Sequence, residues 1–273
     1  MAWFTHQAAS LYYLDINPRA ARCVVLLHGL TNSGRAWAPQ LPALTAAGYR
    51  VIVPDLLGHG ASSPATQTFT PAEQASQLHA LLHHIGVPQA SVVGLSLGGM
   101  VALSWALIAP EQVQRLVVAG SFGHLQTPQL QTMLHAWKAE FCAEGGAVQR
   151  FEQSWPLLVG DAFAASEAGL SWYQAWHAQA AQAHGESLAY WCQGMHSYDL
   201  REALPALAMP TLVLSSSEDL ISPPAEGSWI AERIQPARHT VLPGAGHVFN
   251  VPLAKAFNQA VLEFLSEGHA DAY

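Results

Sequence analysis

The sequence predicts an α/β protein with a doubly wound, mostly parallel sheet and one helical insertion. Three observations predict this class: short apolar runs alternate with helix-like segments, turn residues separate them, and one long stretch lacks strand-like runs. Apolar runs this short are typical of buried parallel strands, because such strands are covered on both faces. The expected strands span residues 22–27, 50–54, 90–94, 113–119, 211–214 and 240–242.

One helix has a complete start signal. Thr70 supplies a hydroxyl N-cap, Pro71 occupies the first helical position, and Glu73 is placed to close a capping box. This helix is expected to run to residue 85, where Gly86 and Pro88 stop it. Further helices are expected over residues 34–47, 97–109 and 252–265, and residues 11–16 predict an antiparallel hairpin at the edge of the sheet.

A helical insertion interrupts the alternation of strands and helices. Residues 127–204 contain no buried-strand pattern, whereas 130–141, 147–155 and 171–183 have helical patterns. The insertion follows one expected strand and precedes another, so it lies beyond the carboxyl ends of the strands, where open α/β sheets build their sites. We therefore expect a core of residues 1–126 and 205–273, with residues 127–204 forming a lid.

A candidate nucleophile lies between the third strand and the helix that follows it. The sequence Gly-Leu-Ser-Leu-Gly spans residues 94–98 and centres on Ser96. Glycines on either side let strand and helix approach closely, so that the serine hydroxyl projects from a tight turn. The same five residues also occur in ordinary glycine-rich turns, but the strand before and the helix after them favour a nucleophile elbow.

A serine nucleophile needs a base and a carboxylate. His247 follows the last expected strand in a glycine-rich loop, which places its imidazole at the same edge of the sheet as Ser96. Asp219 follows the strand at 211–214 and could orient that imidazole, with Glu218 as the neighbouring alternative. The order Ser96, Asp219, His247 is the order that a nucleophile elbow requires.

Acyl transfer also needs hydrogen-bond donors for the oxyanion. The backbone N–H of Leu97, directly after the serine, is one expected donor. The second is expected from Leu30, in the turn that begins at His28 and Gly29 after the first buried strand.

Composition excludes several classes of function. The 273 residues are 51% hydrophobic and 11% charged, with a formal net charge of −8, so a phosphate-binding surface for nucleic acid is not expected. No apolar stretch is long enough for a membrane span, and the N-terminus lacks signal-peptide features, which favours a cytoplasmic protein. The three cysteines are widely spaced, so neither a disulfide framework nor a zinc site is expected.

The ordered motifs resemble the α/β-hydrolase superfamily over nearly the whole chain. They are His28-Gly29, the segment from Asp55 to Ser62, the elbow at 94–98, and Gly246-His247. Asp199-Leu200-Arg201 and the strand that follows resemble the cap exit of the lidded esterase and enol-lactonase group. The resemblance implies Ser96, Asp219 and His247 as a catalytic triad and no cofactor. It also implies that Asp55 and His59 shape a turn. His79 and His83 have the spacing of metal ligands on an expected helix, but no third ligand is evident, so no metal site is expected.

These observations predict a serine hydrolase that cleaves an ester-like bond of a small, largely apolar molecule. Four alternatives stay open: an enol-lactonase, a thioesterase, a carbon–carbon bond hydrolase and a ligand-binding protein without turnover. The protein could also form a homodimer. Several side chains are candidates for the substrate pocket, although the tryptophans could equally form the core of the lid. Arg201 could clamp a substrate carboxylate. The candidates are His28, Trp137, Trp155, Trp172, Trp176, Trp191 and Arg201.

Overall fold

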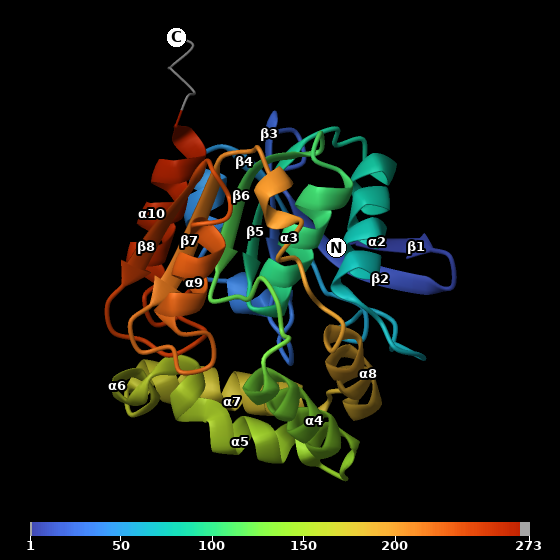
Figure 1. The fold of residues 1–273 in the computed structure, drawn as a ribbon, viewed down its shortest axis with the longest axis vertical. Helices are drawn as coiled ribbons and strands as arrows, with labels where there is room; N and C mark the ends of the chain where they lie inside the picture. The colour runs from blue at the N-terminus through green and yellow to red at the C-terminus, as the bar shows by residue number, and fades with distance from the viewer. Residues whose placement is uncertain (1, 268–273) are drawn as a thin grey trace.

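The computed structural model describes residues 2–267. Its eight strands form a single mixed sheet in the order β1-β2-β4-β3-β5-β6-β7-β8 (Figure 1). Strands β3 to β8 are parallel, and the β1–β2 hairpin is antiparallel at one edge, as the sequence predicts. The strands are β1 (Ala2–His6), β2 (Ala9–Ile16), β3 (Arg22–Leu27), β4 (Tyr49–Pro54), β5 (Ala90–Leu95), β6 (Val113–Ala119), β7 (Thr211–Ser216) and β8 (Ala237–Leu242).

Helices cover both faces of this sheet, which confirms the doubly wound class. Alternating side chains of β3 enter different cores: Val25 packs with α2 (Pro71–His84), α3 (Leu97–Ile108) and α9 (Pro224–Ala231). Val24 packs with η1 (Gly34–Trp37), α1 (Leu41–Ala46) and α10 (Ala254–Ser266) on the other face. Because a parallel strand is buried on both faces, its sequence is continuously apolar, and this explains why these strands could be predicted.

The capping box predicted for α2 is present. The Thr70 hydroxyl accepts from the backbone N–H of Glu73, and the Glu73 carboxylate accepts from the backbone N–H of Thr70. The helix expected over residues 34–47 is instead divided into η1 and α1. Pro39 and Pro42 explain the division, because a proline lacks the N–H that an internal helical position donates.

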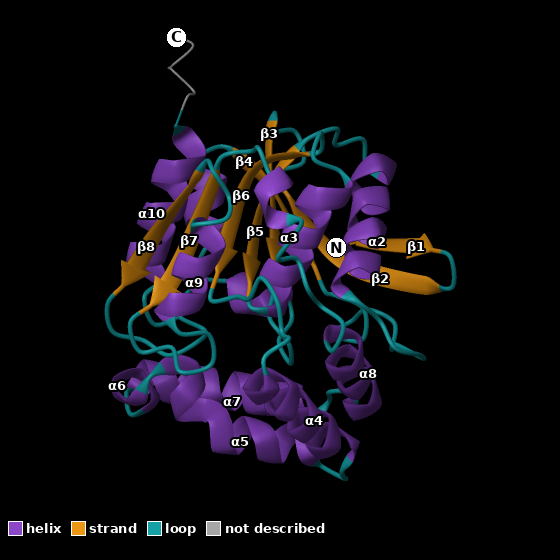
Figure 2. Ribbon diagram, in the orientation of Figure 1, coloured by secondary structure: helices purple, strands orange, loops and turns teal. Residues whose placement is uncertain are grey.

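Five helices form a separate layer that faces the carboxyl ends of the parallel strands, where the arrowheads in Figure 2 point. We call this layer, residues 128–195, the cap. Its boundaries with the core, predicted at 126/127 and 204/205, stay a prediction. The cap helices are α4 (Pro128–Cys142), α5 (Gly146–Val159), α6 (Asp161–Ala164), α7 (Glu167–Ala181) and α8 (Gly185–Met195); the 3₁₀ helix η2 (Leu204–Ala206) follows.

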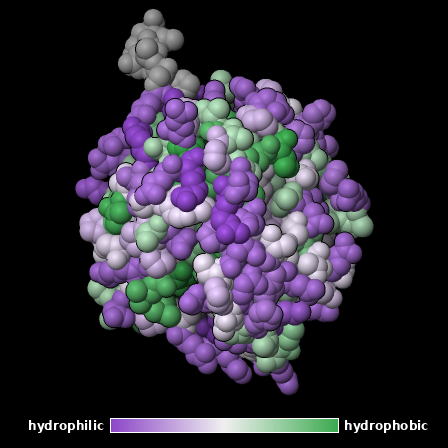
Figure 3. All heavy atoms as spheres, in the orientation of Figure 1, coloured by the Kyte–Doolittle hydropathy of each residue, from purple (hydrophilic) through white to green (hydrophobic). Residues whose placement is uncertain are grey.

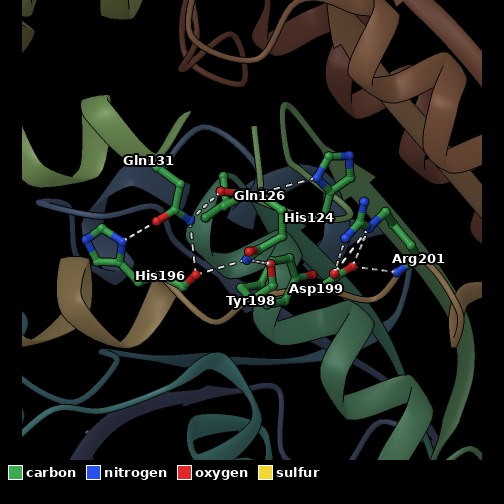
Figure 4. A network of polar contacts seen from close by, with 8 residues as sticks. His124, Gln126, Gln131, His196, Tyr198, Asp199 and Arg201 are labelled. Atoms are coloured by element: carbon green, nitrogen blue, oxygen red, sulfur yellow. Dashed lines mark hydrogen bonds and ion pairs between the residues drawn. The ribbon is translucent and has the colours of Figure 1, made fainter. Parts of the chain in front are cut away.

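Polar side chains join the segment that enters the cap to the segment that leaves it (Figure 4). The Gln126 amide donates to the carbonyls of His196 and Tyr198, and the Gln131 amide also donates to His196. An isolated β-bridge pairs His124 with Asp199 beside them. These bonds fix the neck between cap and core.

Hydrophilic residues predominate on the face shown in Figure 3, and hydrophobic ones are scattered between them. Among residues 2–267, no helix combines the length and the apolar character that a bilayer span requires.

Candidate active site

Ser96 lies in a strained turn between β5 and α3. Its φ of +55° is unusual for a residue with a side chain, and its backbone N–H is held by the carbonyl of Ala119 on β6. The Ser96 carbonyl accepts from the hydroxyl of Ser121 and from the N–H groups of Gly99 and Met100. These bonds fix the turn and leave the serine hydroxyl projecting from it.

Two glycines make this turn sterically feasible. A Cβ atom on Gly94 would lie 2.2 Å from the carbonyl oxygen of Gly98, and one on Gly98 would lie 2.1 Å from the carbonyl oxygen of Leu27. Backbone atoms cannot move aside as a flexible side chain can. The glycines two positions before and after Ser96 are therefore required by the close approach of β3, β5 and α3.

Three side chains from different strand ends form a continuous hydrogen-bonded line. The Ser96 Oγ lies 2.8 Å from Nε2 of His247, and Nδ1 of His247 lies 2.8 Å from Oδ2 of Asp219. The remaining oxygen of Asp219 accepts from the backbone N–H groups of Ile221 and Ser222. This carboxylate is thus held as an acceptor on both oxygens, so Nδ1 of His247 carries the proton and Nε2 is free to accept one.

Glu218, the alternative to Asp219, points elsewhere. Its side chain is exposed, whereas Asp219 is only 1% exposed and contacts the imidazole directly. The geometry therefore brings together Ser96, His247 and Asp219, the three residues that sequence order singles out.

The two expected oxyanion donors border the serine. Leu30 lines the same cavity as Ser96 and His247, and Leu97 is the first residue of α3. Neither backbone N–H donates to a protein group within residues 2–267. Both are therefore available to a substrate oxygen. Gly29 lies against Ser96, because a Cβ atom there would be 3.2 Å from the Cβ of the serine.

The carboxylate of Asp55 joins two turns of the core. One of its carboxylate oxygens accepts from the N–H of Gly34, 2.7 Å away, and the other accepts from the N–H of Ala61, 2.8 Å away. His59 donates from Nδ1 to the Leu57 carbonyl and packs against His28. These contacts match the turn-shaping role that the resemblance implies for Asp55 and His59.

A cavity of about 50 Å³ lies between Ser96, His247 and the cap. Among the predicted pocket residues, Trp137 of α4 lines this cavity. Its other cap residues are spaced three or four apart on one face of α5: Ala147, Arg150, Phe151, Ser154 and Leu158. The helical pattern of α5 was visible in the sequence, but sequence periodicity alone did not identify which face would lie over the serine.

The other pocket candidates lie outside this cavity. His28 is buried and accepts from the N–H of Leu56, and Trp191 is buried against Phe69 and donates to the carbonyl of Leu57. Three further tryptophans pack edge to face within the cap: Trp155, Trp172 and Trp176.

Arg201 does not reach the cavity either. Its guanidinium lies at the neck of the cap, where it forms a bidentate ion pair with Asp199 at 2.6 Å (Figure 4). The arginine that does line the cavity is Arg150, whose guanidinium covers the ring of Trp137 and pairs with Glu140. Arg150 lies within the expected helix at 147–155, whose pattern did not show which face would lie over the serine.

Known proteins share this architecture. The chain is 32% identical over 251 residues to a Yersinia enterocolitica protein named "Putative carbamate hydrolase RutD". The aligned residues cover 91% of this chain and 89% of that protein. An enol-lactonase of Burkholderia xenovorans LB400 superposes with a TM-score of 0.90 at 25% identity, over 97% of this chain and 100% of that one. A thermophilic esterase of Thermogutta terrifontis superposes with a TM-score of 0.87 at 28% identity, over 96% and 95%.

The family model for the alpha/beta hydrolase fold matches residues 22–251. This span includes the elbow, the whole cap and the loops that carry Asp219 and His247. The chain therefore belongs to the α/β-hydrolase family.

Proposed function

We propose that this protein hydrolyses an ester-like bond of a small, largely apolar substrate through an acyl-enzyme on Ser96. The observation that carries the proposal is the line of two 2.8 Å hydrogen bonds from Ser96 through His247 to Asp219. A nucleophile, a base and a group that orients the base within hydrogen-bond reach are the requirements of acyl transfer.

In the first half-reaction, Nε2 of His247 takes the proton of the Ser96 hydroxyl as Oγ attacks the substrate carbonyl carbon. The carbonyl oxygen becomes an oxyanion, which the N–H groups of Leu30 and Leu97 stabilise. His247 then gives the proton to the leaving oxygen as the bond to that oxygen breaks. Asp219 stabilises the imidazolium while the proton is on His247.

Water completes the second half-reaction. His247 takes a proton from the water as its oxygen attacks the acyl carbon, and a second oxyanion forms in the same place. The proton returns to Ser96 Oγ when the acyl bond breaks, which releases the carboxylic acid and restores the free serine. No cofactor enters this sequence of steps.

The surroundings of Ser96 support a small apolar acyl group. Trp137, Phe151 and Leu158 present apolar surface to the cavity of about 50 Å³. Relatives named carbamate hydrolase, enol-lactonase and esterase are named for bonds between a carbonyl carbon and a heteroatom. That shared chemistry is what the proposed triad would catalyse.

Covalent labelling followed by a substrate panel tests the proposal. A fluorophosphonate should raise the intact mass of the wild-type protein by one adduct and leave Ser96→Ala unmodified. The panel then compares esters, an enol-lactone, a carbamate ester and a thioester, and we expect steady turnover of esters. A stoichiometric burst without a steady rate would instead favour a binding protein, and absence of labelling would contradict the proposed nucleophile.

A further inference from the structure

The loop that carries the expected oxyanion donor Leu30 contains a strained residue. We call residues 29–33 the oxyanion loop. Thr31 in this loop has a φ of +70°. A β-branched residue is an outlier in the left-handed region, because its side chain crowds the backbone there. A turn bond from the N–H of Asn32 to the carbonyl of Gly29, 3.2 Å away, spans this residue, and a further contact fixes the carbonyl of Thr31 itself.

A cap residue supplies that contact. The Gln179 side chain of α7 donates from Nε2 to the carbonyl of Thr31, 3.0 Å away. Its Oε1 accepts from the hydroxyl of Ser33, 2.8 Å away. Both ends of one amide group thus bind the oxyanion loop. Within residues 2–267, Gln179 is the cap side chain that hydrogen-bonds to this loop.

The core holds the ends of the loop, and Nδ1 of His28 also donates to the carbonyl of Gly29, 2.9 Å away. Before it, Nε2 of His28 accepts from the N–H of Leu56. After it, the N–H of Gly34 donates to Asp55. Because both ends are held, a rotation of φ at Thr31 must be compensated by the neighbouring peptide planes, and one of these planes carries the N–H of Leu30.

We propose that Gln179 is a positioning residue: it holds Thr31 in the left-handed conformation and thereby aims the N–H of Leu30 at the oxyanion. The inference rests on the proposed function, because it assigns Gln179 a part in stabilising the oxyanion of that reaction. Without Gln179, Thr31 relaxes toward negative φ and the donor turns away. Since an oxyanion contact strengthens in the transition state, the loss falls on kcat and not on KM.

The test compares two glutamines of the same helix region. Gln179→Ala should lower kcat for a small activated ester about 10- to 100-fold with KM within about threefold, less than the full loss of one oxyanion donor. Gln182→Ala is the matched control and should keep wild-type kcat, because Gln182 lies at the C-terminus of α7 and its side chain makes no hydrogen bond within residues 2–267. Gln179→Glu keeps the acceptor for Ser33 but cannot donate to Thr31, so it should lose kcat as Gln179→Ala does.

A second substitution separates positioning from general destabilisation. Glycine adopts a φ of +70° without steric cost, so Thr31→Gly in the Gln179→Ala background should restore at least half of the lost kcat on a logarithmic scale. Unfolding by urea, followed in parallel, shows whether each variant is folded.

The outcomes distinguish the two proposals. Wild-type turnover that Ser96→Ala abolishes, together with wild-type kcat in Gln179→Ala, overturns the role of Gln179 and leaves the proposed function in place. A loss of kcat that Thr31→Gly does not restore overturns it as well. If the wild-type protein neither labels nor turns over any ester, the proposed function fails and the inference fails with it.

Discussion

At the scale of single residues, the two carboxylate oxygens of Asp219 accept hydrogen bonds from different donors. One is fixed by the N–H groups of Ile221 and Ser222, and the other accepts from His247. We expect Ser96→Ala, His247→Ala and Asp219→Asn each to lower kcat by several orders of magnitude without unfolding the protein. Groups that act as one unit fail together, so the double and triple variants should lose little more than the worst single variant. Steady-state kinetics on one activated ester measures all of these.

Glu218 provides the control for the acid of the triad. It is adjacent in sequence and exposed, so Glu218→Gln should keep kcat within about twofold, as substitutions away from the reacting atoms usually do. Near-normal turnover in Asp219→Asn, with loss of turnover in Glu218→Gln, would show that the carboxylate had been assigned to the wrong residue.

Two buried histidines beside the site affect stability rather than chemistry. Burial lowers the pKa of His28 to about 4, and burial together with the nearby His28 lowers the pKa of His59 to about 3. Both values lie below the unfolded value of about 6.5, so the unfolded chain binds more protons in mild acid. The stability that these neutral imidazoles contribute is complete above about pH 6.5 and is lost as the pH falls toward 4.

Urea unfolding measured between about pH 7 and pH 5 tests this linkage. The free energy of unfolding should fall by on the order of 2 kcal/mol for each of the two histidines. His28→Gln should remove its share of this pH dependence, whereas His83→Gln, at an exposed position of α2, should leave the slope unchanged. Equal slopes in wild type and His28→Gln would contradict burial as the cause.

At the scale of elements, the elbow depends on the contact between α3 and β3. Gly98→Ala would push a methyl group against the Leu27 carbonyl, and helix and strand would have to separate. We expect it to lower the free energy of unfolding by about 3 kcal/mol or more and to abolish fluorophosphonate labelling. Thermal unfolding and labelling are the two measurements.

Gly86, at the end of α2, is the matched control. Unlike Gly98, which lies within α3, Gly86 has a positive φ of +67°, and no atom lies within 4 Å of where its Cβ would be. Gly86→Ala should therefore cost only the backbone term of about 1–2 kcal/mol and leave labelling intact. Equal losses in the two alanine variants would mean that the close approach at Gly98 costs no more than the backbone conformation at Gly86, and would contradict this account of the elbow.

Sequence patterns located the elements whose environment is uniform. Buried parallel strands are apolar throughout, and the capping box of α2 is local chemistry, so both could be predicted. The alignment of Ser96, Asp219 and His247 also followed, because the carboxyl ends of parallel strands meet at one edge of the sheet. Helix α8 and the partner of Thr31 were not predicted, because neither has a local signature: Gln179 acts through a loop nearly 150 residues away in sequence.

The three cap tryptophans show a second limit of sequence analysis. An aromatic residue on an amphipathic helix is equally suited to a pocket wall and to a helix interface. The edge-to-face contact of Trp155 on α5 with Trp176 on α7 lies between two cap helices, and Trp172 contacts Trp176 one turn away on α7. Trp137 instead lines the cavity that holds Ser96, and its neighbouring residues in the sequence did not distinguish it from the other three tryptophans.

At the scale of the whole molecule, the cap covers the site and also hydrogen-bonds to the loops that carry its residues. Beyond the bonds of Gln179, the carbonyls of Leu157 and Leu158 at the end of α5 accept from the N–H groups of His247 and Val248. The cap therefore contacts the loop of the proposed base on one side and the oxyanion loop on the other. Movement of the cap would alter both loops together.

The charge of the cap region gives the last prediction. Residues 122–205 hold three basic and eight acidic side chains. Two of the three basic ones are already in ion pairs: Arg150 with Glu140, and Arg201 with Asp199. The cap region over Ser96 therefore has a net negative charge, which repels an approaching polyanion and has little effect on a neutral molecule.

We accordingly expect a higher kcat/KM for neutral short-chain, medium-chain or aryl esters than for the coenzyme A thioester of the same acyl group. The decisive measurement is a matched panel at low and high ionic strength. Salt screens repulsion, so kcat/KM for the thioester should rise with salt while that for the neutral ester stays constant. Faster turnover of the thioester, with a rate that falls as salt rises, would instead mean that Arg150 or another cation attracts the substrate despite its acidic surroundings, and would identify the enzyme as an acyl-thioesterase.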